Sequence, residues 1–355
     1  TSMTDFDCQL IETPRLTMNV WTSGPQDGRP VLLVHGNLVT GGWWRYVAEA
    51  LPDDVRVIAP DLRGFGRTEA VPIDATRGLG DMGDDLHGLL ETLGLAGRGD
   101  LVAAGWSMGG GVLQQYLLEH PGDLGAVVLV APLSPYGFGG TRGADGTLCT
   151  DDFAGTGGGG AAPDFVQRLR DQDATDDAPT SPRVIYRTYF GPGDNADAVD
   201  EDFLVAEMLR TALGDDFYPG DMATSDHWPT VAPGDRGVLN AMSPKHFDAS
   251  ALPGLESKPS ITWIHGEADQ VVSDASMFDF GTLGQLGAVP GWPGADVMPP
   301  QPMATQMRAV LEAYAAAGGT TREQELPGVG HGIPLAAPRV VADALVEVLD
   351  APPGD

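Results

Sequence analysis

Hydrophobic and polar positions follow two different periods along the chain, and the two periods alternate. Short apolar runs bounded by polar residues predict strands, and apolar residues spaced three or four apart predict helices. The expected elements are a hairpin of strands at 8–13 and 16–22, strands at 31–34, 55–59, 101–104 and 126–130, and helices at 43–51, 79–93 and 108–119. Strands and helices in such alternation form a mostly parallel sheet with helices on both faces, the α/β class.

The alternation stops at Pro132 and returns only at residue 260. Residues 133–255 are rich in glycine and aspartate, with a glycine tract at 155–160 and a short helical pattern at 203–213. The later elements are a strand at 260–265, a loose stretch at 276–303, a helix at 304–317, a strand at 321–326 and a last helix at 337–349. Because strands resume, residues 1–132 and 256–355 are expected to form one core, with 133–255 inserted as a lid or cap.

The clearest chemical signal is the run Gly-Trp-Ser-Met-Gly at 105–109, which follows an apolar strand and opens a helical pattern. A Gly-x-Ser-x-Gly turn between a strand and a helix strains the serine backbone and exposes its hydroxyl for nucleophilic attack. Ser107 is therefore the predicted nucleophile. Such a serine needs a base to accept its proton and an acid to orient that base.

The acid and the base are predicted from their positions after later strands, because sheets of this type carry them in the order serine, acid, histidine. Asp269 lies four residues beyond the 260–265 strand, and Glu267 in the same loop is the alternative acid. His331 is the only histidine after residue 265 and stands in a glycine-rich loop after the last strand. We expect Ser107, Asp269 and His331 to form a catalytic triad.

Two backbone N–H groups are expected to stabilise the negative charge of the transition state, as an oxyanion hole. One belongs to Met108, at the start of a helix whose dipole adds to the effect. The other belongs to Asn37, in a His-Gly-Asn-Leu loop at 35–38, where Gly36 permits close approach. His35 is expected to hold this loop rather than to take part in catalysis.

Composition narrows the function further. The chain has 50 acidic and 20 basic residues and a formal net charge of −30, so no basic patch for nucleic acid or an anionic membrane is expected. Such acidity is typical of a salt-adapted surface or of a GC-rich genome. No apolar run reaches the ~18 residues of a membrane span, and a cytoplasmic location is the default. With two cysteines and no HExxH or Cys/His cluster, no metal site is predicted.

Five motifs together resemble the α/β-hydrolase fold family, over nearly the whole chain outside 133–255. They are His-Gly-Asn at 35–37, Asp-Leu-Arg-Gly-Phe-Gly at 61–66, Gly-Trp-Ser-Met-Gly at 105–109, His-Gly-Glu-Ala-Asp at 265–269 and Gly-His-Gly at 330–332. The resemblance implies an eight-stranded sheet, a lid inserted after the sixth strand and no cofactor. Ser107 separates the chain from the haloalkane dehalogenase and epoxide hydrolase relatives, which carry aspartate there. The lid and the 276–303 stretch exceed the usual lengths.

These features predict a serine hydrolase that cleaves a carboxylic ester or lactone through an acyl-enzyme. Pockets in this fold lie between sheet and lid, so lid residues are expected to set specificity. The candidate substrate contacts are Leu38, Trp106, Tyr136 and Trp228, with Phe138, Phe217 and Tyr218 as further lid aromatics. The lid has few cationic side chains that could bind an anionic substrate, which favours a bulky, mostly apolar and uncharged one. The alternatives are C–C bond hydrolysis, cofactor-free perhydrolysis or haloperoxidase activity, and a binding protein without turnover; the oligomeric state is left open.

Overall fold

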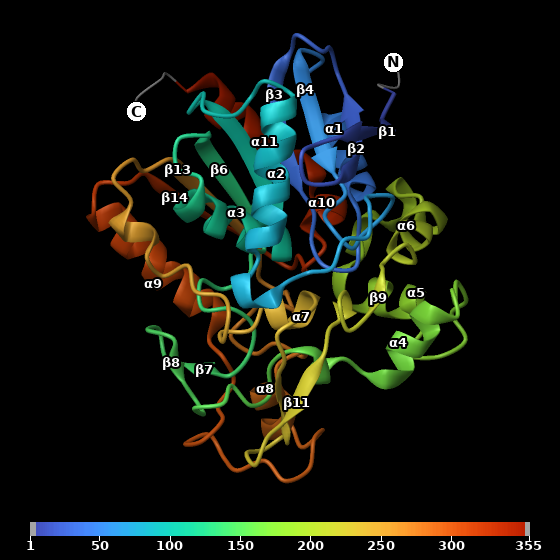
Figure 1. The fold of residues 1–355 in the computed structure, drawn as a ribbon, viewed down its shortest axis with the longest axis vertical. Helices are drawn as coiled ribbons and strands as arrows, with labels where there is room; N and C mark the ends of the chain where they lie inside the picture. Colours follow the sequence, from blue (N-terminus) through green and yellow to red (C-terminus); the bar gives the residue numbers. More distant parts are fainter. Residues whose placement is uncertain (1–4, 352–355) are drawn as a thin grey trace.

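A computed structural model describes residues 5–351, and an eight-stranded sheet forms its centre (Figure 1). The strands lie in the spatial order β1-β2-β4-β3-β5-β6-β13-β14. The β1–β2 and β2–β4 pairs are antiparallel, and every other neighbouring pair in this sheet is parallel. The strands are β1 (Asp7–Glu12), β2 (Thr17–Ser23), β3 (Arg29–Val34), β4 (Val55–Pro60), β5 (Leu101–Trp106), β6 (Leu124–Val130), β13 (Ser260–Gly266) and β14 (Thr321–Leu326).

Helices cover both faces of this sheet. On one face α2 packs against α3 and α3 lies on β5 and β6, with α9 beside them over β14 (Figure 1). On the other face α11 packs against α1 and also contacts β5 and β6. The helices around the sheet are α1 (Arg45–Ala50), α2 (Gly80–Thr92), α3 (Met108–Glu119), α9 (Met303–Ala316), α10 (Ile333–Ala336) and α11 (Pro338–Asp350).

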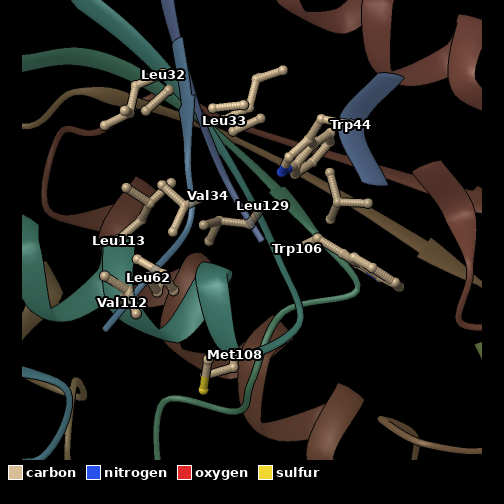
Figure 2. Packing of buried hydrophobic residues seen from close by; sticks show 14 of the residues in the cluster. Leu32, Leu33, Val34, Trp44, Leu62, Trp106, Met108, Val112, Leu113 and Leu129 are labelled. Carbon is tan, nitrogen blue, oxygen red and sulfur yellow. The ribbon is translucent and has the colours of Figure 1, made fainter. Parts of the chain in front are cut away.

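The apolar residues that predicted the strands form the core. Strand β5 is buried along its whole length, as expected for a central parallel strand with helices on both faces. Figure 2 shows Leu32 and Val34 of β3 on the side of Leu113 in α3, and Leu33 on the opposite side, toward Trp44. The predicted fold class, a mostly parallel eight-stranded sheet flanked by helices, is confirmed.

The chain leaves the sheet after β6 and returns at β13, and the intervening segment holds only short elements. These are β7 (Thr141–Arg142), β8 (Thr147–Leu148), α4 (Pro163–Arg170), α5 (Pro182–Ile185), α6 (Glu201–Met208), β9 (Leu213–Gly214), β10 (Tyr218–Pro219), β11 (Met222–Thr224), β12 (Val231–Pro233) and α7 (Val238–Ala241). They lie beyond the carboxyl ends of the parallel strands (Figure 1). We refer to residues 133–255 as the lid.

One predicted lid element is shorter than expected. The helical pattern at 203–213 gives α6, which begins at Glu201 and ends at Met208. The Thr211 hydroxyl donates to the Met208 carbonyl oxygen at 2.8 Å, and the Ala212 amide donates to the Gly64 carbonyl oxygen at 2.9 Å. These bonds turn the backbone away from the helix axis, so tertiary contacts override the local pattern.

The stretch between β13 and α9, which contains α8 (Phe280–Gln285), packs against the lid. The Trp228 indole donates to the Pro290 carbonyl oxygen at 2.9 Å, and the Arg142 guanidinium donates to the Asp296 carbonyl oxygen at 2.8 Å. The Gln301 side-chain amide donates to the Gly137 carbonyl oxygen at 3.0 Å. The sequence pattern assigned this stretch to the core, but its contacts make it a second part of the lid. Within residues 5–351 no helix is both long and apolar enough to cross a lipid bilayer.

Candidate active site

Ser107 lies on the sharp turn between β5 and α3. Its backbone adopts φ 56° and ψ −118°, a strained conformation for a residue with a side chain. The turn is close to β3, because a Cβ atom at Gly109 would stand 2.2 Å from the Val34 carbonyl oxygen. Glycine at 109 is therefore required for the helix to start here, and this start leaves the Ser107 side chain at the carboxyl edge of the sheet.

Two loops at the same edge bring an imidazole and a carboxylate to this serine. The Ser107 Oγ atom lies 3.0 Å from His331 Nε2, and His331 Nδ1 lies 2.8 Å from an oxygen of Asp269. A carboxylate only accepts hydrogen bonds, so Nδ1–H donates to Asp269 and Nε2 is left to accept from the serine hydroxyl. The Asp269 and His331 side chains are only 1% and 4% exposed, which keeps this line of hydrogen bonds away from bulk water.

The structure also distinguishes the two acids that the sequence offered. The second Asp269 oxygen accepts hydrogen bonds from the amides of Val271 at 2.7 Å and Val272 at 2.9 Å, which fix the orientation of the carboxylate. Glu267 is exposed, and its carboxylate accepts from the Gly328 amide at 2.9 Å. Asp269 is thus the acid that contacts His331, and Glu267 instead ties the β13 loop to the β14 loop.

The loop after β3 lies against the serine. A Cβ atom at Gly36 would stand 3.1 Å from Ser107 Cβ, so only glycine fits comfortably at this approach. Asn37 and Met108 both line the cavity described below, and neither backbone amide donates to any partner within residues 5–351. Both amides therefore have no backbone partner among the described residues, as the oxyanion hole expected from the sequence would require.

His35 is placed as a structural residue, as the sequence suggested. Its Nδ1 donates to the Gly36 carbonyl oxygen at 2.7 Å, and its Nε2 accepts from the Leu62 amide at 2.8 Å. Complete burial lowers the pKa of His35 to about 4, so the ring is neutral and joins the two loops that follow β3 and β4.

A cavity of about 550 Å³ opens at the Ser107 side chain, between the sheet edge and both parts of the lid. No Asp, Glu, Lys or Arg is among its lining residues, so apolar groups dominate the wall. Leu38 and Trp106 line it as predicted. Further aromatic side chains of the lining come from the lid and from the stretch after β13, and they are Phe138, Phe165, Phe190, Tyr218, Phe278 and Phe280.

Two predicted substrate contacts, Tyr136 and Trp228, are wrong, because neither side chain lines the cavity. The Tyr136 ring packs on Gly146, where it would collide with any Cβ. Trp228 donates to the Pro290 carbonyl and meets the ring of Phe280 edge-on, at 6.1 Å between centroids. Trp228 therefore supports a lining residue from behind. Phe217, a further aromatic candidate, also lies outside the lining.

Sequence reasoning missed Phe278 and Phe280 as lining residues. The available signal was the run Met-Phe-Asp-Phe at 277–280, which follows the Asp269 loop closely and so must begin near the active site. The unusual length of the 276–303 stretch is visible in the sequence, but no role in the cavity was predicted for it.

Groups of acidic and histidine side chains that could hold a cation lie elsewhere. Within residues 5–351 they are Asp84/Glu119/His120, Asp151/Asp152/His227 and His265/Glu323/Glu325, and none of these residues lines the cavity. In the first of them Asp84 already pairs with Arg77 and with His120. The cavity lining itself offers no cluster of metal ligands.

Comparison with known proteins identifies the fold, and it finds relatives that match about a third of the chain. The family model described as alpha/beta hydrolase fold matches residues 29–148. Over 123 residues the chain is 32% identical to the cis-3-alkyl-4-alkyloxetan-2-one decarboxylase of Xanthomonas campestris. This match covers 33% of the chain and 40% of that protein. Over 109 residues it is 35% identical to the 2-hydroxy-6-oxo-6-phenylhexa-2,4-dienoate hydrolase of Burkholderia cepacia, and this match covers 30% of the chain and 37% of that protein.

Solved structures resemble nearly the whole chain. A bromoperoxidase from Bacillus anthracis matches with a TM-score of 0.61 and 19% identity, over 97% of this chain and 100% of its own. An esterase from Rhodococcus sp. matches with a TM-score of 0.56 and 15% identity, over 97% of this chain and 98% of its own. The family model spans the segment from β3 to β8, and these structures match almost the whole chain at under 20% identity, so the comparisons show that the chain has the α/β-hydrolase fold.

Proposed function

We propose that the protein is a serine hydrolase that cleaves a carboxylic ester or a lactone through an acyl-enzyme intermediate. The observation that carries the proposal is the line of hydrogen bonds from Ser107 Oγ through His331 to Asp269, at 3.0 and 2.8 Å. Its serine end lies at an apolar cavity. A serine activated by an oriented imidazole is the arrangement that acyl transfer requires.

In the first half of the reaction, His331 Nε2 accepts the Ser107 proton while Oγ attacks the carbonyl carbon of the ester. The electron pair of the carbonyl moves to its oxygen, which the free amides of Asn37 and Met108 stabilise. Asp269 stabilises the imidazolium that forms and stays ionised. When the tetrahedral intermediate collapses, the imidazolium gives its proton to the leaving alkoxide, and the acyl group remains on Ser107.

In the second half, water takes the place of the alcohol. His331 accepts a proton from the water, the hydroxide attacks the acyl-enzyme, and the same two amides stabilise the second oxyanion. Collapse returns the proton to Ser107 and releases the acid. For a lactone, the leaving alkoxide remains attached to the acyl chain, so the product is one hydroxy acid.

The cavity favours an uncharged and largely apolar substrate. Its volume of about 550 Å³ accommodates a drug-sized ligand, and no cationic side chain lines it. A buried carboxylate without a cationic partner costs several kcal/mol, so the anionic dienoate named for the Burkholderia relative lacks a binding partner here. The Xanthomonas relative is named for an alkyl-substituted oxetan-2-one, a four-membered lactone, which suits such a wall better.

An active-site label tests the proposal. A fluorophosphonate should add once, at Ser107, and Ser107→Ala should lose both the label and all hydrolysis of 4-nitrophenyl aryl esters. Ser250→Ala, which removes a lid hydroxyl outside the cavity lining, should keep both. Rapid turnover of the dienoate without turnover of any ester or lactone would instead establish C–C bond hydrolysis. Complete inertness toward label and substrates would favour a binding protein.

A further inference from the structure

The polar groups on the cavity wall are few, and most already have partners inside the protein. Besides Ser107 and His331, the polar side chains of the lining are Asn37, Thr156, Thr180 and Tyr218. The Thr156 hydroxyl donates to the Phe153 carbonyl oxygen at 2.9 Å, and the Thr180 hydroxyl donates to the Asp164 carboxylate. Asn37 belongs to the oxyanion loop. Outside that loop, Tyr218 is the member of this set whose side chain has no hydrogen bond within residues 5–351.

Tyr218 is held firmly in the lid. Its strand β10 pairs with β9, its amide donates to the Ala212 carbonyl oxygen at 3.1 Å, and its ring meets the Phe165 ring edge-on with 6.3 Å between centroids. The residue is 5% exposed, and its hydroxyl has no hydrogen-bond partner within residues 5–351. Burial raises the pKa of this phenol well above its ordinary value, so the group is a neutral donor.

A hydroxyl without a protein partner on a largely apolar cavity wall can give its hydrogen bond to a ligand and so fix the orientation of that ligand. We propose that the Tyr218 hydroxyl is a specificity determinant that donates a hydrogen bond to an uncharged oxygen in the apolar part of the substrate. The acceptor would be a ketone, ether or hydroxyl oxygen, away from the ester or lactone carbonyl that Ser107 attacks. The inference rests on the proposed function for the identity of the attacked group.

The surroundings of Tyr218 define the class of acceptor. Since no cation lines the cavity, an acceptor with a full negative charge would be desolvated without compensation. A neutral oxygen carries no such penalty, and it accepts the hydrogen bond that the Tyr218 hydroxyl donates. A purely hydrocarbon substrate leaves the phenol unpaired and is disfavoured, because sites built around a hydrogen-bonding group reject analogues that lack the matching group.

The test moves one oxygen along a fixed chain. The substrates are 4-nitrophenyl decanoate and isosteric esters in which each methylene remote from the ester is replaced in turn by an ether oxygen or a ketone. At one chain position the oxygen should raise kcat/KM by about 3- to 10-fold over the plain chain, as one net hydrogen bond would. Tyr218→Phe keeps the ring and removes the hydroxyl, so it should abolish this preference for one chain position.

A matched control and a binding measurement complete the design. Tyr136→Phe makes the same chemical change at a lid tyrosine outside the cavity lining, and should keep the wild-type preference. Dissociation constants of the same esters on Ser107→Ala, with and without Tyr218→Phe, measure the hydrogen bond without turnover. A preference in binding that depends on Tyr218, with no hydrolysis by the wild-type protein, would support the Tyr218 hydrogen bond and overturn the proposed function. If neither measurement finds a chain position whose preference depends on Tyr218, the proposed hydrogen bond from Tyr218 is overturned.

Discussion

At the scale of single residues, the members of the proposed triad could be predicted because each follows the end of a strand. Ser107 follows β5 directly, Asp269 follows β13 and His331 follows β14. The carboxyl ends of parallel strands meet at one edge of the sheet, so the order of strands fixes which side chains can meet. The contacts of the lid aromatics depend on how the lid folds back, and no local pattern specifies that. Tyr136 and Trp228 were therefore misplaced.

The pair Asp269 and Glu267 gives a sharp test at this scale. Asp269→Asn should reduce kcat/KM for an ester by about 10⁴-fold, because an amide can impose the wrong histidine tautomer and cannot stabilise the imidazolium. The circular dichroism spectrum should not change, since asparagine retains an oxygen for the amides of Val271 and Val272.

Glu267→Gln is the matched control, two residues away in the same loop. It retains an acceptor for the Gly328 amide and does not touch His331, so activity should stay within a few-fold of wild type. A larger loss of kcat/KM in Glu267→Gln than in Asp269→Asn would show that the acid has been misassigned.

At the scale of elements, the sheet and its helices followed the hydrophobic periods closely, whereas the lid did not. Helix α3 and strand β14 have the bounds that the sequence predicts, 108–119 and 321–326. Lid strands such as β9 and β10 span only two residues, too short for any period to register. Side-chain hydrogen bonds hold other parts of the lid together: Asn240 accepts from the Gly158 and Gly234 amides, both at 3.0 Å. Bonds of this kind join distant residues and leave no periodic trace.

Helix α8 carries a pH-dependent contribution to stability. Its N-cap, Asp279, is buried and accepts hydrogen bonds from the Gln301 amide at 2.7 Å and the Gly281 amide at 3.4 Å. Burial outweighs these bonds and raises the pKa of Asp279 to about 6, from 3.8 for an ordinary aspartate. Because the folded state holds the proton more tightly, this group lowers stability as pH rises from about 4 to about 6, by on the order of 3 kcal/mol.

Asp279→Asn should therefore raise the free energy of unfolding above pH 6 and have little effect near pH 4, where wild-type Asp279 is protonated in the folded state. Asparagine keeps the oxygen that accepts from Gln301 and removes the buried charge. Denaturant unfolding of both proteins at a series of pH values measures the difference. A difference that does not vary with pH, or one that grows toward pH 4, would contradict the role given to Asp279.

At the scale of the whole molecule, the sheet provides the catalytic edge and two separate segments build the lid over it. The surface that encloses them is strongly acidic, with 50 acidic and 20 basic residues. In places several carboxylates share one cation: Arg236 faces Asp215 at 3.3 Å, Asp216 at 3.0 Å and Asp221 at 3.7 Å. Such clusters pair some charges, but the excess of carboxylates is left to repel across the surface.

This repulsion predicts a stability that depends on salt. A net charge of −30 opposes the compact state through self-repulsion, and salt screens it, since the Debye length falls from ~30 Å at 0.01 M to ~3 Å at 1 M. The Tm should therefore rise as sodium chloride increases from ~0.05 to ~2 M, with most of the rise at the low end, where screening changes fastest. Sucrose at matched osmolality is the control, because it acts by exclusion from the surface without screening charge. A rise with sodium chloride that sucrose does not reproduce would tie stability to the acidic surface and support a salt-adapted protein. A Tm that stays flat across this range would leave genome composition as the source of the charge.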